Sequence, residues 1–168
     1  MSIVKMTLNG SAMHAEVEAR TSLADFLREQ LNLTATHLAC EHGVCGACTV
    51  LLNGEPVRGC LTLAIACEGV DVRTFEGLRD DRVMHALVQS FHENHGLQCG
   101  FCTPAMLVTA RDLILRGKAT SDQEVRLGIS GNLCRCTGYT SIVDSVRKAA
   151  EALGSTQHRP SGSAVGGS

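Results

Sequence analysis

The chain has 168 residues and a formal net charge of −2 at pH 7, and 44% of its residues are hydrophobic. That length suits one large or two small domains, and that hydrophobic content can form a core without disulfides. The near-neutral charge and an aromatic content of 3% argue against nucleic acid or an anionic membrane surface as a partner. The N-terminal segment lacks the sustained apolar region of a signal peptide, and no apolar run reaches membrane-spanning length. We therefore expect a cytoplasmic protein whose thiols stay reduced.

Two β-hairpins are predicted in the first half of the chain. Residues 3–19 and 49–60 alternate apolar and polar side chains, and each segment contains an Asn-Gly dipeptide, starting at Asn9 and at Asn53. An Asn-Gly pair between alternating segments is the strongest short signal for a hairpin. A further strand is expected within residues 69–78.

A helix and a long loop separate the two hairpins. Residues 21–31 carry apolar side chains at helical spacing, and Ser22 and Asp25 are placed as a capping box. Residues 34–48 have no periodicity, so we expect a loop there. Strands packed against one helix predict a small α+β domain over residues 1–77.

After this domain the periodicity becomes helical. Apolar stripes and end signals predict four helices, within residues 81–96, 103–117, 121–130 and 141–153. In the first of them, Met84, Leu87, Val88 and Phe91 lie on one face. The second has Thr103 as N-cap, Pro104 in its first turn and Gly117 after its end. The third and fourth open with capping boxes at Ser121 and Ser141.

The second part of the chain is therefore expected to be a helical domain followed by a tail. Four helices of modest length predict a compact four-helix bundle over residues 78–153. Residues 154–168 have too few apolar side chains to fold alone, which predicts a flexible C-terminal tail. An arm that becomes ordered on a partner's surface is the alternative.

Eight of the nine cysteines fall into two sets. In the first set, Cys40, Cys45, Cys48 and Cys60 have the spacing of plant-type [2Fe–2S] ferredoxins. Such a cluster needs four thiolates from a compact loop, and small residues such as Gly43 let the backbone approach it closely. Structural zinc favours paired knuckles of two cysteines, so this spacing favours an iron–sulfur cluster over zinc.

The second set is Cys99, Cys102, Cys134 and Cys136. Each half of the set stands just before a predicted helix, and the partial positive charge of a helix N-terminus favours thiolates. Spacing alone leaves both an iron–sulfur cluster and zinc open for this set.

Three motifs together resemble a known family. "CEHGVCGAC", "QCGFCTPAM" and "SGNLCRCTGY" resemble the small iron–sulfur subunit of the molybdenum hydroxylases, the xanthine oxidase family. The resemblance covers residues 3 to 153. Within the family, the chain resembles the separate small subunits of bacterial enzymes such as quinoline 2-oxidoreductase and carbon monoxide dehydrogenase. One departure is Ala105, where the family often has glycine. A helix tolerates alanine better than glycine, so the departure puts little in doubt.

The resemblance implies an α+β fold in which a plant-ferredoxin-like, β-grasp domain precedes the helical domain. It also implies two [2Fe–2S] clusters on this chain, one near a flavin on Cys40, Cys45, Cys48 and Cys60, and one near molybdopterin on Cys99, Cys102, Cys134 and Cys136. In the family, the residues at the positions of Gln98 and Cys136 also touch the pterin.

The resemblance further implies an electron-transfer subunit of a multi-subunit oxidoreductase with no catalytic residue or substrate site on this chain. Its partners would be a large subunit with molybdopterin in the cytosine dinucleotide form and a medium subunit with FAD, assembled as a dimer of heterotrimers. The substrate would be a small molecule such as an N-heteroaromatic compound. The alternative is a stand-alone ferredoxin-like carrier or a zinc-binding interaction module.

Three further residues have simpler interpretations. Cys67 lies in an apolar segment and is expected to be an inert core residue. His42 is expected to be a solvated loop residue, because four cysteines already satisfy a cluster. Arg135, between two cysteines, could offset cluster charge or simply be solvated.

Overall fold

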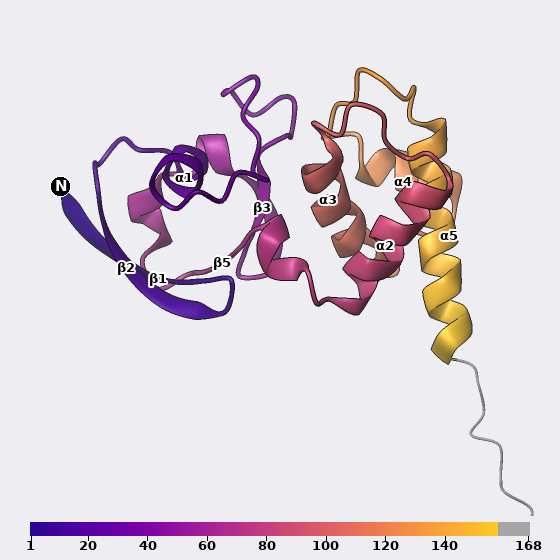
Figure 1. Cartoon of the computed structure of the whole chain (residues 1–168), viewed down its shortest axis with the longest axis horizontal. Coiled ribbons are helices and arrows are strands. Elements are labelled where there is room, and N and C mark those ends of the chain that lie inside the picture. Colours follow the sequence, from indigo (N-terminus) through magenta and orange to yellow (C-terminus); the bar gives the residue numbers. More distant parts are fainter. Residues whose placement is uncertain (158–168) are drawn as a thin grey trace, which may run out of the picture.

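The structure, a computed structural model, describes residues 1–157, which form a sheet lobe and a helical lobe side by side (Figure 1). The strands are β1 Ser2–Leu8, β2 Ser11–Val17, β3 Thr49–Leu52, β4 Glu55–Arg58 and β5 Asp71–Arg73. The α-helices are α1 Leu23–Asp25, α2 Arg82–Glu93, α3 Thr103–Leu115, α4 Asp122–Gly128 and α5 Thr140–Gln157. A π-helical turn covers Phe26–Gln30, and 3₁₀ turns cover Gly59–Leu61, Ala64–Cys67 and Phe75–Leu78.

Both predicted hairpins are confirmed. β1 pairs antiparallel with β2 and β3 pairs antiparallel with β4, with one Asn-Gly turn in each. Asn9 and Gly10 have φ of 50° and 85°, and Asn53 and Gly54 have φ of 48° and 85°. Two successive positive φ angles are those of a type I′ turn, which matches the twist of the strands.

The short strand β5 joins the hairpins into one sheet. It pairs parallel with β1 and antiparallel with β3, which gives the strand order β2-β1-β5-β3-β4. The predicted strand within residues 69–78 is thus confirmed, although it is only three residues long.

The predicted first helix is present in a different form. Its α-helical part ends at Asp25 and continues as the π-helical turn. After this turn, Leu33 N–H donates to Leu27 O at 2.9 Å. Ser22 accepts a hydrogen bond from the backbone N–H of Asp25, which confirms one half of the predicted capping box, while Asp25 Oδ2 accepts from the Ser22 hydroxyl rather than from its backbone N–H. Phe26 and Leu27 are fully buried against the sheet, so the widened turn still delivers its apolar side chains to the core.

The second lobe contains the four predicted helices. α2 packs on α3 and α5, and α4 also packs on α3 and α5. The predicted stripe of α2 is correct for Met84, Leu87 and Phe91, which are buried, and wrong for Val88, which is 44% exposed. The α4 capping box at Ser121 is confirmed.

Three helix ends differ from their predictions. α3 already includes Thr103, so Cys102 stands at the N-cap position instead, without a side-chain capping hydrogen bond. α5 begins at Thr140, because Val143 N–H already bonds Tyr139 O, so Ser141 lies inside the helix. α5 also continues to Gln157, past the predicted end at Leu153. The rest of the predicted tail, residues 158–168, lies outside the described residues.

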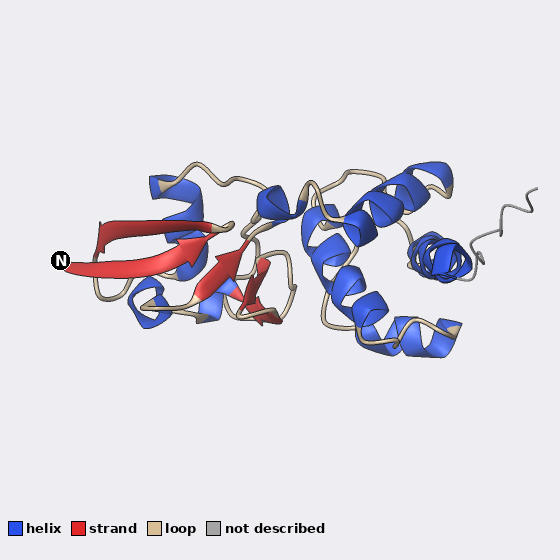
Figure 2. Cartoon of the chain, turned by 90° about the horizontal axis from the view of Figure 1, so that it is seen from below, coloured by secondary structure: helices blue, strands red, loops and turns tan. Residues whose placement is uncertain are grey.

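The two lobes meet where α3 packs on β3 and β4. Leu51 of β3 is buried in the helical core rather than in the core under the sheet. Figure 2 shows the helices α2 to α5 on one side of this junction, and the sheet with the short helical turns of the first lobe on the other. Within residues 1–157, no helix has both the length and the apolar character needed to cross a bilayer.

Candidate iron–sulfur centres

The first cysteine set is brought together at the end of the sheet lobe. Cys40, Cys45 and Cys48 lie in the loop before β3, and Cys60 lies in the 3₁₀ turn after β4. The backbone N–H of Cys45 donates to the Cys40 sulfur at 3.3 Å, and that of Cys60 donates to the Cys48 sulfur at 3.5 Å. The Cys45 thiolate also contributes to the raised pKa of Cys48. The set therefore consists of two pairs, Cys40 with Cys45 and Cys48 with Cys60, that lie next to each other.

Two glycines give this loop its shape. Gly43 and Gly46 have left-handed φ angles of 85° and 74°, which glycine adopts without strain. A Cβ at Gly43 would lie 2.4 Å from Leu61 Cδ1, and a Cβ at Gly46 would lie 2.3 Å from the carbonyl oxygen of Gly131. A side chain is therefore excluded at Gly46 by the neighbouring backbone and disfavoured at Gly43 by Leu61, while the close approach of this loop to a cluster stays a prediction.

The thiols of the first set differ in their environments. The backbone N–H of Cys45, helped by that of His42, lowers the pKa of Cys40 to about 6. Burial raises the pKa of Cys48 to about 11. Amide N–H groups that stabilise a thiolate favour the form of cysteine that binds metals.

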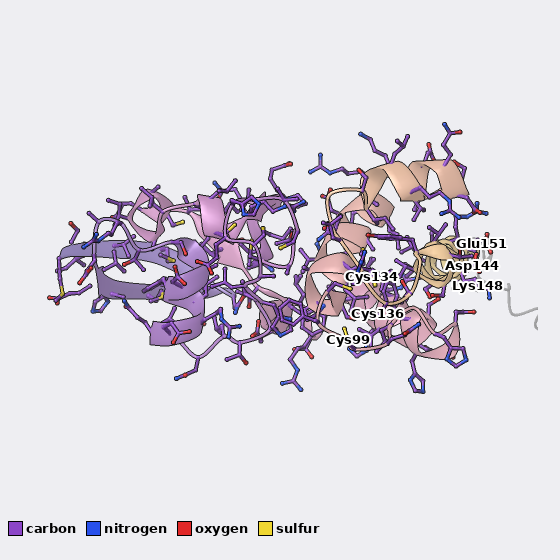
Figure 3. The ribbon with its side chains drawn as sticks, turned by 90° about the horizontal axis from the view of Figure 1, so that it is seen from above. Cys99, Cys134, Cys136, Asp144, Lys148 and Glu151 are labelled. Carbon is purple, nitrogen blue, oxygen red and sulfur yellow. The ribbon has the colours of Figure 1, made fainter. Side chains whose placement is uncertain are left out.

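The second set comes from two loops that precede helices. Cys99 and Cys102 stand before α3, and Cys134 and Cys136 stand before α5, as Figure 3 shows for the three that it labels. The thiols of Cys99 and Cys136 lie close enough to shift each other's pKa, and so do those of Cys102 and Cys134. The predicted convergence of two helix starts on one group of cysteines is present.

Neighbouring side chains shape the loop around Cys134. The backbone N–H of Cys134 donates to the hydroxyl of Tyr139 at 2.9 Å. Thr137 places its hydroxyl 3.2 Å from the Cys134 sulfur and its N–H 3.5 Å from it. Burial alone would raise the pKa of Cys134, but the hydrogen bonds of Thr137, together with those of the Cys136 backbone and the Cys102 thiol, lower it. Burial raises the pKa of Cys102 to about 12.

The arrangement of the thiols fits a two-iron cluster in each set. Zinc requires four ligands around one ion, whereas a [2Fe–2S] cluster takes two thiolates at each of two irons. Two neighbouring pairs per set match the second requirement, and backbone N–H groups already point at the sulfurs.

The other residues singled out in the sequence lie as follows. Gln98 and Cys136 are both exposed. His42 is exposed, and its Nδ1 contacts the carbonyl oxygen of Cys40. Cys67 is fully buried in the sheet lobe, as expected of a core residue, and Arg135 is exposed.

A buried polar network between the lobes was not foreseen from the sequence. Asn132, 2% exposed, donates from Nδ2 to the carbonyl oxygen of Gly46 at 3.0 Å and contacts the Thr49 hydroxyl at 3.3 Å. Arg58 donates to the Thr49 hydroxyl at 2.7 Å and to the carbonyl oxygen of Gly131. In the sequence, the network is marked only by the asparagine two residues before Cys134. Its partners Gly46 and Thr49 are more than eighty positions away, so the sequence did not indicate the contact.

The two cysteine loops also touch directly through their backbones. Leu133 N–H donates to the carbonyl oxygen of Cys45 at 2.8 Å. Leu133 precedes one cysteine of the second set, and Cys45 belongs to the first. One hydrogen bond therefore connects the backbone next to Cys134 directly to the backbone of Cys45, and so joins the two cysteine sets.

Known proteins share both halves of this architecture. The family described as a 2Fe-2S iron-sulfur cluster binding domain matches residues 6–75, and the family described as a [2Fe-2S] binding domain matches residues 74–147.

Several relatives match nearly the whole chain. The caffeine dehydrogenase subunit gamma of Pseudomonas sp. (strain CBB1) is 53% identical over 86% of this chain and 89% of that protein. The nicotine 6-hydroxylase small subunit of Paenarthrobacter nicotinovorans is 45% identical over 90% of this chain and 91% of that protein. A chain of quinoline 2-oxidoreductase from Pseudomonas putida 86 superposes with a TM-score of 0.85 and 48% identity, covering 92% of this chain and 96% of that one.

These similarities agree with the resemblance that the three cysteine motifs indicated. The relatives are much more than 30% identical, and this chain covers most of their length. The chain belongs to the small iron–sulfur subunits of the molybdenum hydroxylases and is a subunit of a multi-subunit oxidoreductase.

Proposed function

We propose that this chain holds two [2Fe–2S] clusters, one on each cysteine set. The cysteines of the first are Cys40, Cys45, Cys48 and Cys60, and those of the second are Cys99, Cys102, Cys134 and Cys136. The observation that carries the proposal is the division of each set into two neighbouring thiol pairs with N–H donors at the sulfurs. When bound, the clusters supply two one-electron centres.

The chain carries electrons from a molybdopterin site on a large subunit to FAD on a medium subunit. Its residues contribute spacing and environment: the junction of α3 with β3 and β4 fixes the two cysteine loops, and Leu133 and Cys45 connect them at 2.8 Å. The second set meets the large subunit, because Cys99 and Cys136 are exposed beside Gln98, where a pterin could be contacted. The first set faces the medium subunit.

The finer features of the assembly follow from the family. The pterin is the cytosine dinucleotide form, and the complex is a dimer of heterotrimers in the cytoplasm. Two relatives are named for caffeine and nicotine, and a third for quinoline, which supports a small N-heteroaromatic substrate bound by the large subunit.

The domains follow the same plan. Residues 1–77 form the ferredoxin-like domain, residues 78–153 the helical domain and residues 154–168 the tail. The ring of contacts from α2 to α3, α4 and α5 and back to α2 supports a four-helix bundle in the second domain.

Purification of the chain from its native host tests the proposed function. We expect a brown complex with two larger chains, containing about four irons and four sulfides per copy of this chain. A colourless chain that purifies alone, or one that contains a single zinc, would overturn the proposal in favour of a stand-alone carrier or a zinc module.

A further inference from the structure

The carbonyl oxygen of Gly46 is held unusually firmly for a loop residue. It accepts hydrogen bonds from Thr49 N–H at 3.1 Å, from the Thr49 hydroxyl at 2.6 Å and from Asn132 Nδ2 at 3.0 Å. Two of these donors belong to the sheet lobe, whereas Asn132 lies in the helical lobe, two residues before Cys134. Gly46, Thr49 and Asn132 are all buried, so water does not compete for these bonds.

The same peptide unit points at a cysteine of the first set. The N–H on the other side of the Gly46–Ala47 peptide bond is that of Ala47, and it donates to the Cys45 sulfur at 3.5 Å. A peptide unit is planar and trans, so its C=O and N–H point in opposite directions. Fixing the carbonyl of Gly46 therefore also aims the N–H of Ala47.

The orientation of the Asn132 side chain is determined by its partners. Gly46 O can only accept a hydrogen bond, so the amide nitrogen of Asn132 must face it. The amide oxygen then accepts from the hydroxyl of Thr109, on α3, at 3.0 Å. The backbone N–H of Asn132 is bonded to Ile129 O at 2.8 Å, which fixes the main chain as well. Asn132 is thus held by the helical lobe while it holds the sheet lobe.

We propose that Asn132 is a positioning residue that raises the reduction potential of the first cluster, although it belongs to the motif of the second. This inference rests on the proposed function, since it requires a cluster on the first cysteine set. An N–H that donates to a ligand sulfur stabilises the more negative, reduced state of a cluster. By fixing the Gly46–Ala47 peptide, Asn132 maintains such a donor at Cys45.

The test is a potentiometric EPR titration of both clusters in the assembled complex. In Asn132→Ala we expect the reduction equilibrium constant of the first cluster to fall about tenfold, equal to about 59 mV for one electron. The potential of the second cluster, in the same sample, should change much less. A variant that merely loosens the fold would instead broaden or shift both signals.

Four other variants make the test specific. Thr109→Val removes the hydroxyl that orients Asn132, and we expect a smaller shift of the first cluster in the same direction. Thr49→Val removes a donor to the same carbonyl and should also lower the first potential, whereas Thr49→Ser keeps the hydroxyl and should restore it. Asn94→Ala is the matched control, because the Asn94 amide donates to Ser90 at the end of α2, and neither potential should change.

The outcomes separate this inference from the proposed function. Absence of two [2Fe–2S] signals in the unmodified complex would overturn both. Two normal signals with an unchanged first potential in Asn132→Ala, or equal shifts of both potentials, would overturn the role of Asn132 alone. If the complex with Asn132→Ala does not assemble, an unchanged reduction potential of the first cluster in Thr109→Val would equally overturn the role of Asn132.

Discussion

The two cysteine sites of this chain are built in different ways. The first takes three of its cysteines from one loop and the fourth from the 3₁₀ turn that follows the β3–β4 hairpin, and Cys48 is buried. The second takes two cysteines from each of two loops that precede α3 and α5, and Cys99 and Cys136 are exposed. The first site is therefore the more buried of the two, because none of its cysteines is exposed, whereas the two loops at helix starts leave two cysteines of the second site exposed.

This difference is related to what each site contacts. The first site is closed on the side of the helical lobe by Gly131, Asn132 and Leu133, which approach Gly46 and Cys45. The second site has its own lobe behind it and its exposed cysteines on the surface. The first site therefore depends on the junction between the lobes, and the second depends on its helices.

The largest expected effect comes from removing a ligand of the first site. In Cys45→Ser, we expect loss of the first cluster only, with about two irons per chain instead of about four and one remaining [2Fe–2S] EPR signal. Electron exit to the acceptor should slow accordingly. Cys67→Ala is the control, since Cys67 is buried away from both sets and both signals should persist. Retention of both signals and full turnover in Cys45→Ser would exclude Cys45 as a ligand.

A ligand of the second site should give the complementary result. In Cys136→Ser, the second EPR signal should be lost or altered while the first persists, because the two sets share no cysteine. Since Cys136 is exposed, the pterin content of the purified complex should also fall. Loss of the first signal rather than the second would reverse our assignment of the two sites.

The junction between the lobes can be tested with a single methyl group. In Gly46→Ala, the new Cβ would lie 2.3 Å from Gly131 O at a φ of 74°, so we expect a loss of about 3 kcal/mol or more in the free energy of unfolding. Gly10→Ala is the matched control: its φ is 85°, but nothing lies within 4 Å of the added Cβ. That variant should lose only about 1–2 kcal/mol, the cost of the left-handed conformation. If urea unfolding showed equal losses of unfolding free energy in Gly46→Ala and Gly10→Ala, the two lobes would not be in close contact at Gly46.

The smallest effect concerns the scaffold of the second site. Asp81 caps α2 through Met84 N–H at 2.9 Å and contacts Arg111 of α3 at 2.7 Å. Burial opposes ionisation of Asp81, but the Arg111 guanidinium and the N–H of Met84 outweigh it, so its pKa is below the ordinary value of 3.8. Asp81→Asn keeps the cap and loses the ion pair, which should cost about 1 kcal/mol or less.

The pH dependence of that cost follows from the sign of the shift. A carboxyl whose pKa is lowered by folding contributes stability above its ordinary pKa and loses that contribution as the pH falls through the lower value. The difference between the unmodified protein and Asp81→Asn should therefore be the same in urea unfolding at pH 8 and at pH 5. Asp80→Asn, at an exposed neighbour, is the control. A difference that vanishes between these pH values would contradict our assignment of the charge to Asp81.

Local signals predicted most of the elements. The Asn-Gly turns at Asn9 and Asn53 predicted both hairpins, because a type I′ turn depends on only two residues. The capping box at Ser121 predicted the start of α4, because a capping box also depends on only a few neighbouring residues. The predicted N-caps Thr103 and Ser141 lie one and two residues past the observed N-cap positions, because each helix begins within the preceding cysteine loop, where tertiary contacts rather than caps determine the backbone.

Long-range contacts were beyond the sequence. The cysteine spacing indicated which residues belong to each set, but the pairing of β5 with β1 and the contact of Asn132 with Gly46 join residues more than sixty positions apart. Val88 illustrates the same limit: its position on the α2 stripe is apolar by pattern, yet the neighbouring helices leave it 44% exposed. Only tertiary packing, both within each lobe and between the two lobes, determines such positions.

The most direct test of this account is the EPR spectrum of the reduced complex, combined with iron and zinc analysis. We predict two distinct [2Fe–2S] signals of equal spin count, with only one lost in Cys45→Ser and only the other in Cys136→Ser. A single signal that both substitutions abolish, or zinc in place of iron, would contradict the claim that this chain holds two separate electron-transfer centres.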